Sequence, residues 1–145
     1  MEPLNVGSGS VGLDTSIFIY YIEAHRKYLP LVEPIFEAAD AGGITIVTSA
    51  VTLLELLVMP YRNDDAPLAT KYEQLLTRSR GVRLVALDHS QLRAAAYLRA
   101  SHGLRTMDAI QLSAALASGC STFVTNDLKL PKIPGLKVVQ LQDLI

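Results

Sequence analysis

Four acidic residues of this chain stand among apolar neighbours that a folded domain would bury. Asp14 ends the stretch Val-Gly-Leu-Asp, and Glu55 lies inside Leu-Leu-Glu-Leu-Leu. Asp108 opens Asp-Ala-Ile, and Asp127 closes Phe-Val-Thr-Asn-Asp. An ionised carboxylate that leaves water is costly unless it is paired, hydrogen-bonded, protonated or bound to a cation. With no matching set of buried Lys or Arg evident in the sequence, the pattern predicts one acidic pocket around a divalent metal.

The residue types also select the metal and the chemistry. Two carboxylates about 4–5 Å apart repel by roughly 3–4 kcal/mol at an effective dielectric near 20, so a shared cation would relieve the repulsion. The candidate ligands are all oxygen atoms, which favour Mg²⁺ or Mn²⁺ over Zn²⁺. Such ions support phosphodiester hydrolysis by activating water and stabilising charge on the phosphate.

Each acid also has a purely structural interpretation. Asp14 and Asp127 could be turn or capping residues, and Asp108 sits where the dipole of a helix favours an acid. Glu55 is the hardest to explain in this way, because apolar residues surround it within one helical turn.

Short apolar strands and amphipathic helices alternate along the chain, which predicts a three-layer α/β sandwich on a parallel sheet of about five strands. The expected strands cover residues 11–14, 44–48, 82–87, 122–125 and 137–140. The expected helices cover residues 17–22, 29–41, 50–59, 67–80, 90–101 and 107–118. We expect Thr15 or Ser16, Ser49 and Thr106 to cap helices, and the third helix to stop before Pro60. Asp14 and Asp127 then lie at the carboxyl ends of strands, where ligands of such sheets bind.

Length and composition agree with one domain over residues 1–145. Half of the residues are hydrophobic and the net charge is −1, so a uniformly basic nucleic-acid binder is excluded, but a local basic rim is not. The single cysteine, Cys120, excludes an internal disulfide framework and is interpreted as a small buried hydrophobe. No secretory signal or membrane span is evident, and we expect a cytoplasmic protein that does not bind membranes.

The four acidic motifs together resemble those of the PIN-domain ribonuclease family, which includes the VapC-type toxins of VapBC toxin–antitoxin pairs. The matching pieces are Leu-Asp-Thr-Ser at 13–16, Leu-Leu-Glu-Leu at 53–56, Met-Asp-Ala-Ile-Gln-Leu at 107–112 and Phe-Val-Thr-Asn-Asp at 123–127. Their order and spacing match, and the resemblance covers nearly the whole chain.

The resemblance implies a PIN fold and a metal-dependent endoribonuclease that uses Mg²⁺ or Mn²⁺. Asp14 and Asp108 would be the leading metal ligands, with Glu55 and Asp127 completing the acidic set. Thr125 matches a hydroxyl position that helps orient water or metal in the family. The resemblance also implies an RNA substrate, a cognate antitoxin protein as partner, and a homodimer.

Two other functions stay open at this level. An aspartate-based phosphatase or phosphotransferase would use Asp14 as nucleophile, but the second acid usual two residues later is replaced by Ser16. A non-catalytic PIN-fold module would bind RNA or protein without turnover. Candidate residues for the RNA backbone are Arg78, Arg80, Arg83, Lys129, Lys132 and Lys137, of which Lys129 and Lys132 are the strongest because they follow Asp127.

Overall fold

A five-stranded parallel sheet lies at the centre of the computed structural model, which describes residues 9–145. The strands are β1 (Gly9–Leu13), β2 (Ile44–Ser49), β3 (Val82–Val85), β4 (Thr122–Thr125) and β5 (Lys137–Gln140). They lie in the order β3-β2-β1-β4-β5, and every neighbouring pair is parallel. All five carboxyl ends therefore lie at the same edge of the sheet, as the sequence pattern predicts.

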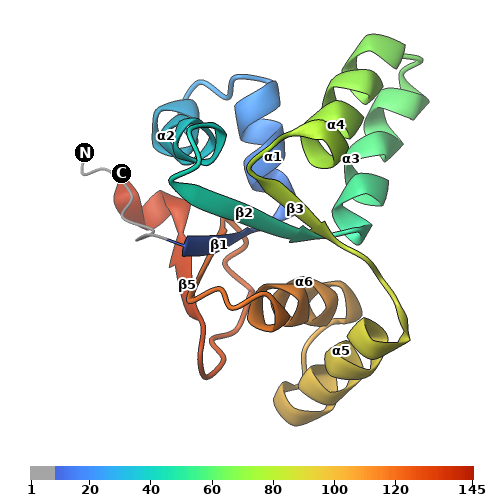
Figure 1. Cartoon of the computed structure of the whole chain (residues 1–145), viewed down its shortest axis with the longest axis vertical. Helices are drawn as coiled ribbons and strands as arrows, with labels where there is room; N and C mark the ends of the chain where they lie inside the picture. Colours follow the sequence, from blue (N-terminus) through green and yellow to red (C-terminus); the bar gives the residue numbers. More distant parts are fainter. Residues whose placement is uncertain (1–8) are drawn as a thin grey trace.

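Helices cover both faces of the sheet (Figure 1). One face carries α1 (Thr15–Ile22), α2 (Leu29–Asp40), α3 (Val51–Arg62) and α4 (Ala66–Arg78). The other carries α5 (His89–His102) and α6 (Thr106–Ala117), and a short 3-10 helix (Leu141–Leu144) follows β5. The predicted three-layer α/β sandwich is thereby confirmed.

Consecutive strand residues contribute to two separate hydrophobic layers. Ile46 packs in the core beneath α1–α4, whereas its neighbour Val47 packs beneath α5 and α6. Likewise, Val124 packs in the core beneath α1–α4 and its neighbour Phe123 packs beneath α5 and α6. Because both faces of the sheet are covered, the three central strands β2, β1 and β4 carry no charged residue.

Gly12 allows α6 to lie unusually close to the sheet. A Cβ atom at this position would be 2.7 Å from the Phe123 ring and 2.9 Å from the Ala115 Cβ atom. Since α6 carries Asp108, the absence of a side chain at Gly12 helps to set the depth at which that carboxylate approaches β1.

Several element boundaries differ from those predicted. Helix α3 continues through Pro60 to Arg62, because a proline in the last turn removes one helical hydrogen bond without breaking the chain direction. The first strand ends at Leu13, and β3 ends at Val85. Within residues 9–145, no helix combines the length and apolarity needed to cross a membrane.

The three predicted helix caps are each displaced by at least one position. Asp14 itself caps α1, and its side chain accepts the backbone N–H of Thr15. The N-cap positions of α3 and α6 are occupied by Ala50 and Arg105, neither of which makes a side-chain cap bond. Only the side chain of Ser49 comes close to the predicted role, accepting the Val51 N–H at 3.3 Å.

Candidate active site

The four predicted acids meet at one cleft on the carboxyl edge of the sheet. Asp14 directly follows β1 and Asp127 lies just beyond the adjacent strand β4, while Glu55 comes from α3 and Asp108 from α6. The cleft has a volume of about 400 Å³. Its lining consists of Asp14, Glu55, Arg105, Thr106, Met107, Asp108, Gln111 and Asp127. Residues up to 113 positions apart in the chain thus share one surface.

Asp14 is fixed at the centre of this edge by two hydrogen bonds to its two oxygens. The backbone N–H of Thr15 donates to Oδ1 at 2.8 Å, and the hydroxyl of Thr125 donates to Oδ2 at 2.6 Å. The backbone N–H of Asp14 in turn donates to the Val124 carbonyl at 3.0 Å. The carboxylate is therefore oriented by both β4 and the start of α1.

Glu55 is oriented by the residue that follows Asp14. The hydroxyl of Thr15 donates to Glu55 Oε1 at 2.6 Å and lies 3.4 Å from the hydroxyl oxygen of Thr52. Thr52 is fully buried one turn before Glu55 on α3. Thr15 therefore links Asp14, which follows β1, to Glu55 on α3.

Gln111 supports this arrangement from α6, and sequence reasoning did not identify it. Its Nε2 donates to the Thr52 hydroxyl at 2.7 Å, and its Oε1 accepts the Ser49 backbone N–H at 3.3 Å. The side chain is buried, with a relative exposure of 5%. The available signal was weak: Gln111 follows Asp108 by one helical turn and stands between the apolar residues Ile110 and Leu112.

Thr125 contacts two members of the acidic set. Besides donating to Asp14, its Oγ1 accepts the backbone N–H of Asp127 at 3.0 Å. Asp127 Oδ1 also accepts the backbone N–H of Lys129 at 2.9 Å. Asn126 points elsewhere, donating through Nδ2 to the Tyr20 hydroxyl at 3.2 Å, which is a structural role.

Arg105 is a second residue of the site that the sequence analysis missed. Its Nε donates to Asp108 Oδ2 at 2.7 Å, and its terminal NH2 group donates to Asp127 Oδ2 at 2.6 Å. The sequence analysis considered only buried cations, and the partner that Asp108 and Asp127 share is an exposed arginine. The available signal was the spacing of three residues between Arg105 and Asp108, which places both side chains on one helical face.

The carboxyl groups differ in their electrostatics. Burial raises the pKa of Asp14 above its ordinary value, and the charges of Glu55 and Asp108 add to the rise, against the hydrogen bonds from Thr125 and Thr15. The pKa of Asp127 is lowered, first by the Lys129 backbone N–H and further by Arg105. The deepest acid therefore carries the unfavourable charge, and the outer one is already compensated.

The donor set fits a hard divalent cation in type and charge, since four carboxylates line the cleft and the buried one is destabilised by its neighbours. Among residues 9–145, no group of three or more His, Cys, Asp or Glu side chains is arranged to hold one ion. Mg²⁺ needs only one or two carboxylates besides waters and substrate oxygens, so the residues present are sufficient.

The candidate RNA-binding cations are divided between two edges of the sheet. Arg78 and Arg80 precede β3, and Lys137 begins β5, so these three lie toward the amino ends of the parallel strands. Arg83 lies within β3, and Lys129 and Lys132 are in the segment between β4 and β5. Of the six candidates, Lys129 contacts the acidic set, through its backbone N–H to Asp127 Oδ1.

Comparisons with known proteins agree with this geometry. A sequence profile of the PIN domain matches residues 11–136, which is most of the chain and includes all four acids. Among curated proteins, no sequence is similar enough to count as a match.

Solved structures share the fold at low sequence identity. A chain of VapBC2 from Rickettsia felis, bound to a promoter DNA fragment, matches with a TM-score of 0.67 and 22% identity, covering 90% of this chain and 98% of that one. A chain of a toxin–antitoxin complex from Klebsiella pneumoniae matches with a TM-score of 0.65 and 21% identity, covering 90% of this chain and 97% of that one. VapC20 from Mycobacterium tuberculosis is described as a toxin that cleaves the sarcin-ricin loop. It matches with a TM-score of 0.65 and 15% identity, covering 83% of this chain and 92% of that one.

Proposed function

Because the chain belongs to the PIN-domain family, we propose that it is a metal-dependent endoribonuclease that hydrolyses RNA phosphodiester bonds. The observation that carries this proposal is the convergence of Asp14, Glu55, Asp108 and Asp127 on one cleft. Family membership supports a nuclease activity, and the oxygen-only donor set supports Mg²⁺ or Mn²⁺ as the cofactor.

In the proposed reaction, Asp14 and Asp108 hold the divalent cation, and Glu55 and Asp127 complete the acidic set. The bound ion would activate the attacking water and stabilise negative charge on the phosphate. Thr125 keeps the Asp14 carboxylate in one orientation through its 2.6 Å hydrogen bond. A rigid acidic set of this kind lowers the reorganisation needed when the phosphate becomes more negative.

The test is cleavage of a synthetic oligoribonucleotide by purified protein with Mg²⁺ or Mn²⁺. We expect Asp14→Asn and Asp108→Asn each to lower the rate by about 100-fold or more, since second-sphere changes alone often cost 10- to 100-fold. Glu33→Gln is the matched control, because it neutralises an exposed acid on α2 outside the cleft.

Two results would contradict the nuclease proposal. One is full cleavage in excess EDTA, and the other is full cleavage by both asparagine variants. RNA binding without turnover at saturating metal would instead favour a non-catalytic module, and a trapped phosphate on Asp14 would favour the phosphotransferase.

We further propose that the protein is the toxin of a toxin–antitoxin pair and acts in the cytoplasm. The structural similarity to chains of VapBC complexes supports an antitoxin as partner. A short adjacent gene whose product co-purifies with this chain and suppresses RNA cleavage is the expected finding. Absence of any such neighbouring product would leave a nuclease without the toxin role.

A homodimer is the expected assembly state, and sedimentation velocity on the purified chain tests it. The apolar start of α1 does not supply the interface, since Ile17 and Phe18 are fully buried in the core. A sedimentation coefficient of a monomer at micromolar concentration would contradict the expected dimer.

A further inference from the structure

Arg105 stands at the N-cap position of α6, but its side chain does not cap the helix backbone. Ser, Thr, Asp and Asn are the usual caps. A cation at a helix N-terminus also opposes the dipole of the helix. The side chain of Arg105 instead pairs with the carboxylate of Asp108 in the first turn of α6 and reaches beyond the helix to Asp127.

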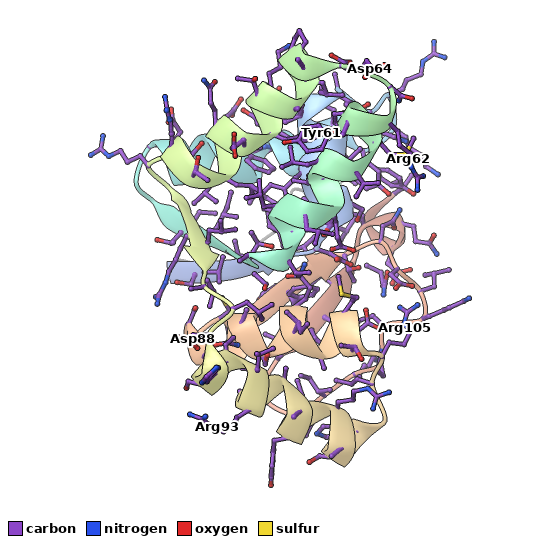
Figure 2. The ribbon with its side chains drawn as sticks, turned by 90° about the vertical axis from the view of Figure 1, so that its right-hand side faces the viewer. Tyr61, Arg62, Asp64, Asp88, Arg93 and Arg105 are labelled. Atoms are coloured by element: carbon purple, nitrogen blue, oxygen red, sulfur yellow. The ribbon has the colours of Figure 1, made fainter. Side chains whose placement is uncertain are left out.

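Arg105 lines the cleft and lies next to the start of α6 (Figure 2). It binds Oδ2 of Asp108 at 2.7 Å and Oδ2 of Asp127 at 2.6 Å, which joins α6 to the segment after β4. Its side chain is 58% exposed, while that of Asp108 is only 15% exposed. The two bonds use two of the five N–H donors of a guanidinium, so others remain for a ligand in solvent.

Charge explains why this position matters for RNA. Four of the residues that line the cleft are acidic, and Arg105 is the single cationic residue among them. An RNA backbone entering the cleft meets these negative charges. A planar guanidinium binds phosphate through two parallel hydrogen bonds, as it binds a carboxylate.

We propose that Arg105 is a substrate-binding residue that alternates between these carboxylates and an RNA phosphate. This inference rests on the proposed nuclease function. In the metal-free protein Arg105 neutralises Asp108 and Asp127. A divalent cation competes for the same carboxylate oxygens, and the released guanidinium binds the backbone phosphate of the substrate.

The first experiment measures Mn²⁺ binding by calorimetry without RNA. Arg105→Ala is expected to bind Mn²⁺ about tenfold more tightly than the unchanged protein, because no guanidinium competes with the ion. Arg105→Lys keeps a positive charge, and its Mn²⁺ affinity is expected to lie between those of Arg105→Ala and the unchanged protein. Arg93→Ala is the matched control, since Arg93 is an exposed arginine on α5, well away from Arg105 (Figure 2), and is expected to leave the affinity unchanged.

The second experiment measures steady-state cleavage of an oligoribonucleotide at saturating Mn²⁺. Arg105→Ala is expected to raise KM about tenfold with a smaller change in kcat, because the lost contact is to the bound backbone. Arg105→Lys is expected to raise KM by less than Arg105→Ala does, because the lysine ammonium keeps the positive charge but lacks the planar guanidinium that binds phosphate through two hydrogen bonds.

The outcomes separate the two proposals. Equal or weaker Mn²⁺ binding by Arg105→Ala, or an unchanged KM, overturns the role of Arg105 while leaving a cleaving enzyme intact. If the unchanged protein neither binds Mn²⁺ nor cleaves RNA, the nuclease proposal itself fails, and the inference about Arg105 fails with it.

Discussion

Thr125 donates a 2.6 Å hydrogen bond to Oδ2 of Asp14, across 111 positions of sequence. Thr125 is fully buried, so this bond is shielded from competing water. The Asp14 carboxylate is thus held by a hydroxyl and a backbone N–H, and the cation in the cleft, Arg105, binds other acids. This arrangement leaves Asp14 with a charge that the protein does not neutralise, from which the first prediction follows.

Asp14→Asn is expected to stabilise the metal-free protein at pH 7. Burial raises the pKa of this carboxyl in the folded state, so folding weakens as pH rises from its unfolded value near 3.8 through the raised folded value. The amide removes that charge, and we expect Tm to increase by about 2–4 °C in EDTA. The difference should shrink toward pH 3, where the carboxyl is protonated.

Thermal unfolding at pH 7 and pH 3 checks this expectation, with Glu33→Gln as the exposed control. An unchanged or lower Tm for Asp14→Asn at pH 7 would show that burial of the carboxylate is not destabilising. The role of Asp14 in RNA cleavage would then not come at a cost to the stability of the metal-free protein.

Thr15→Val is expected to lower RNA cleavage by about tenfold with little change in fold. The substitution keeps a β-branched side chain but removes the hydroxyl that donates to Glu55 at 2.6 Å, and positioning contacts of this kind are typically worth 10- to 100-fold. Thr15→Ser retains the hydroxyl and should recover most of the rate. Steady-state kinetics of the two variants decide the matter, and equal rates would mean that the orientation of Glu55 is unimportant.

Gln111→Leu is expected to destabilise the protein by about 2–3 kcal/mol. The substitution removes the side-chain partner of the buried Ser49 N–H and one of the partners of the Thr52 hydroxyl, which also lies 2.6 Å from the Thr48 hydroxyl. Burying a polar group that has lost its partner costs roughly 1–3 kcal/mol. Urea unfolding gives the change in free energy. Gln74→Leu, at an exposed position on α4, is the control and should change it by less than about 0.5 kcal/mol. A small effect at both positions would mean that water satisfies the network.

Cys120 is expected to resist alkylation in the native protein. The thiol is buried, and burial raises its pKa to about 11, so the reactive thiolate is scarce at pH 8. Iodoacetamide labelling followed by mass spectrometry should be slow in buffer and rapid in urea. Rapid labelling without denaturant would show that the strand start at Cys120 opens readily.

The sequence was sufficient for the architecture and for the convergence of the acids. The strand Ile44–Ser49 is rich in β-branched residues and has no charged residue on either face, a pattern that favours a sheet covered on both sides. Once parallel strands are inferred, Asp14 and Asp127 must share an edge. The boundaries were less predictable, because caps depend on competing partners: the hydroxyl of Thr15 bonds Glu55, so Asp14 caps the helix instead.

Side-chain partners were the least predictable part of the site. Arg105 looked like an ordinary exposed arginine before a helix, and its bond to Asp127 spans 22 residues that no local pattern connects. Gln111 was likewise hidden, because a polar residue on an apolar helix can face solvent or a buried network with equal ease. Only the positions of Thr52 and Ser49 in space distinguish these two cases.

The sheet order has a consequence for synthesis of the chain. Because β4 is inserted beside β1 although it comes fourth in sequence, Asp14 lacks its hydroxyl partner Thr125, and the cleft lacks Asp127, until the ribosome has passed residue 127. A nascent polypeptide shorter than this cannot assemble the cleft. If the protein does attack RNA, the cell is spared from partially translated copies, and any binding partner has to act only on finished molecules.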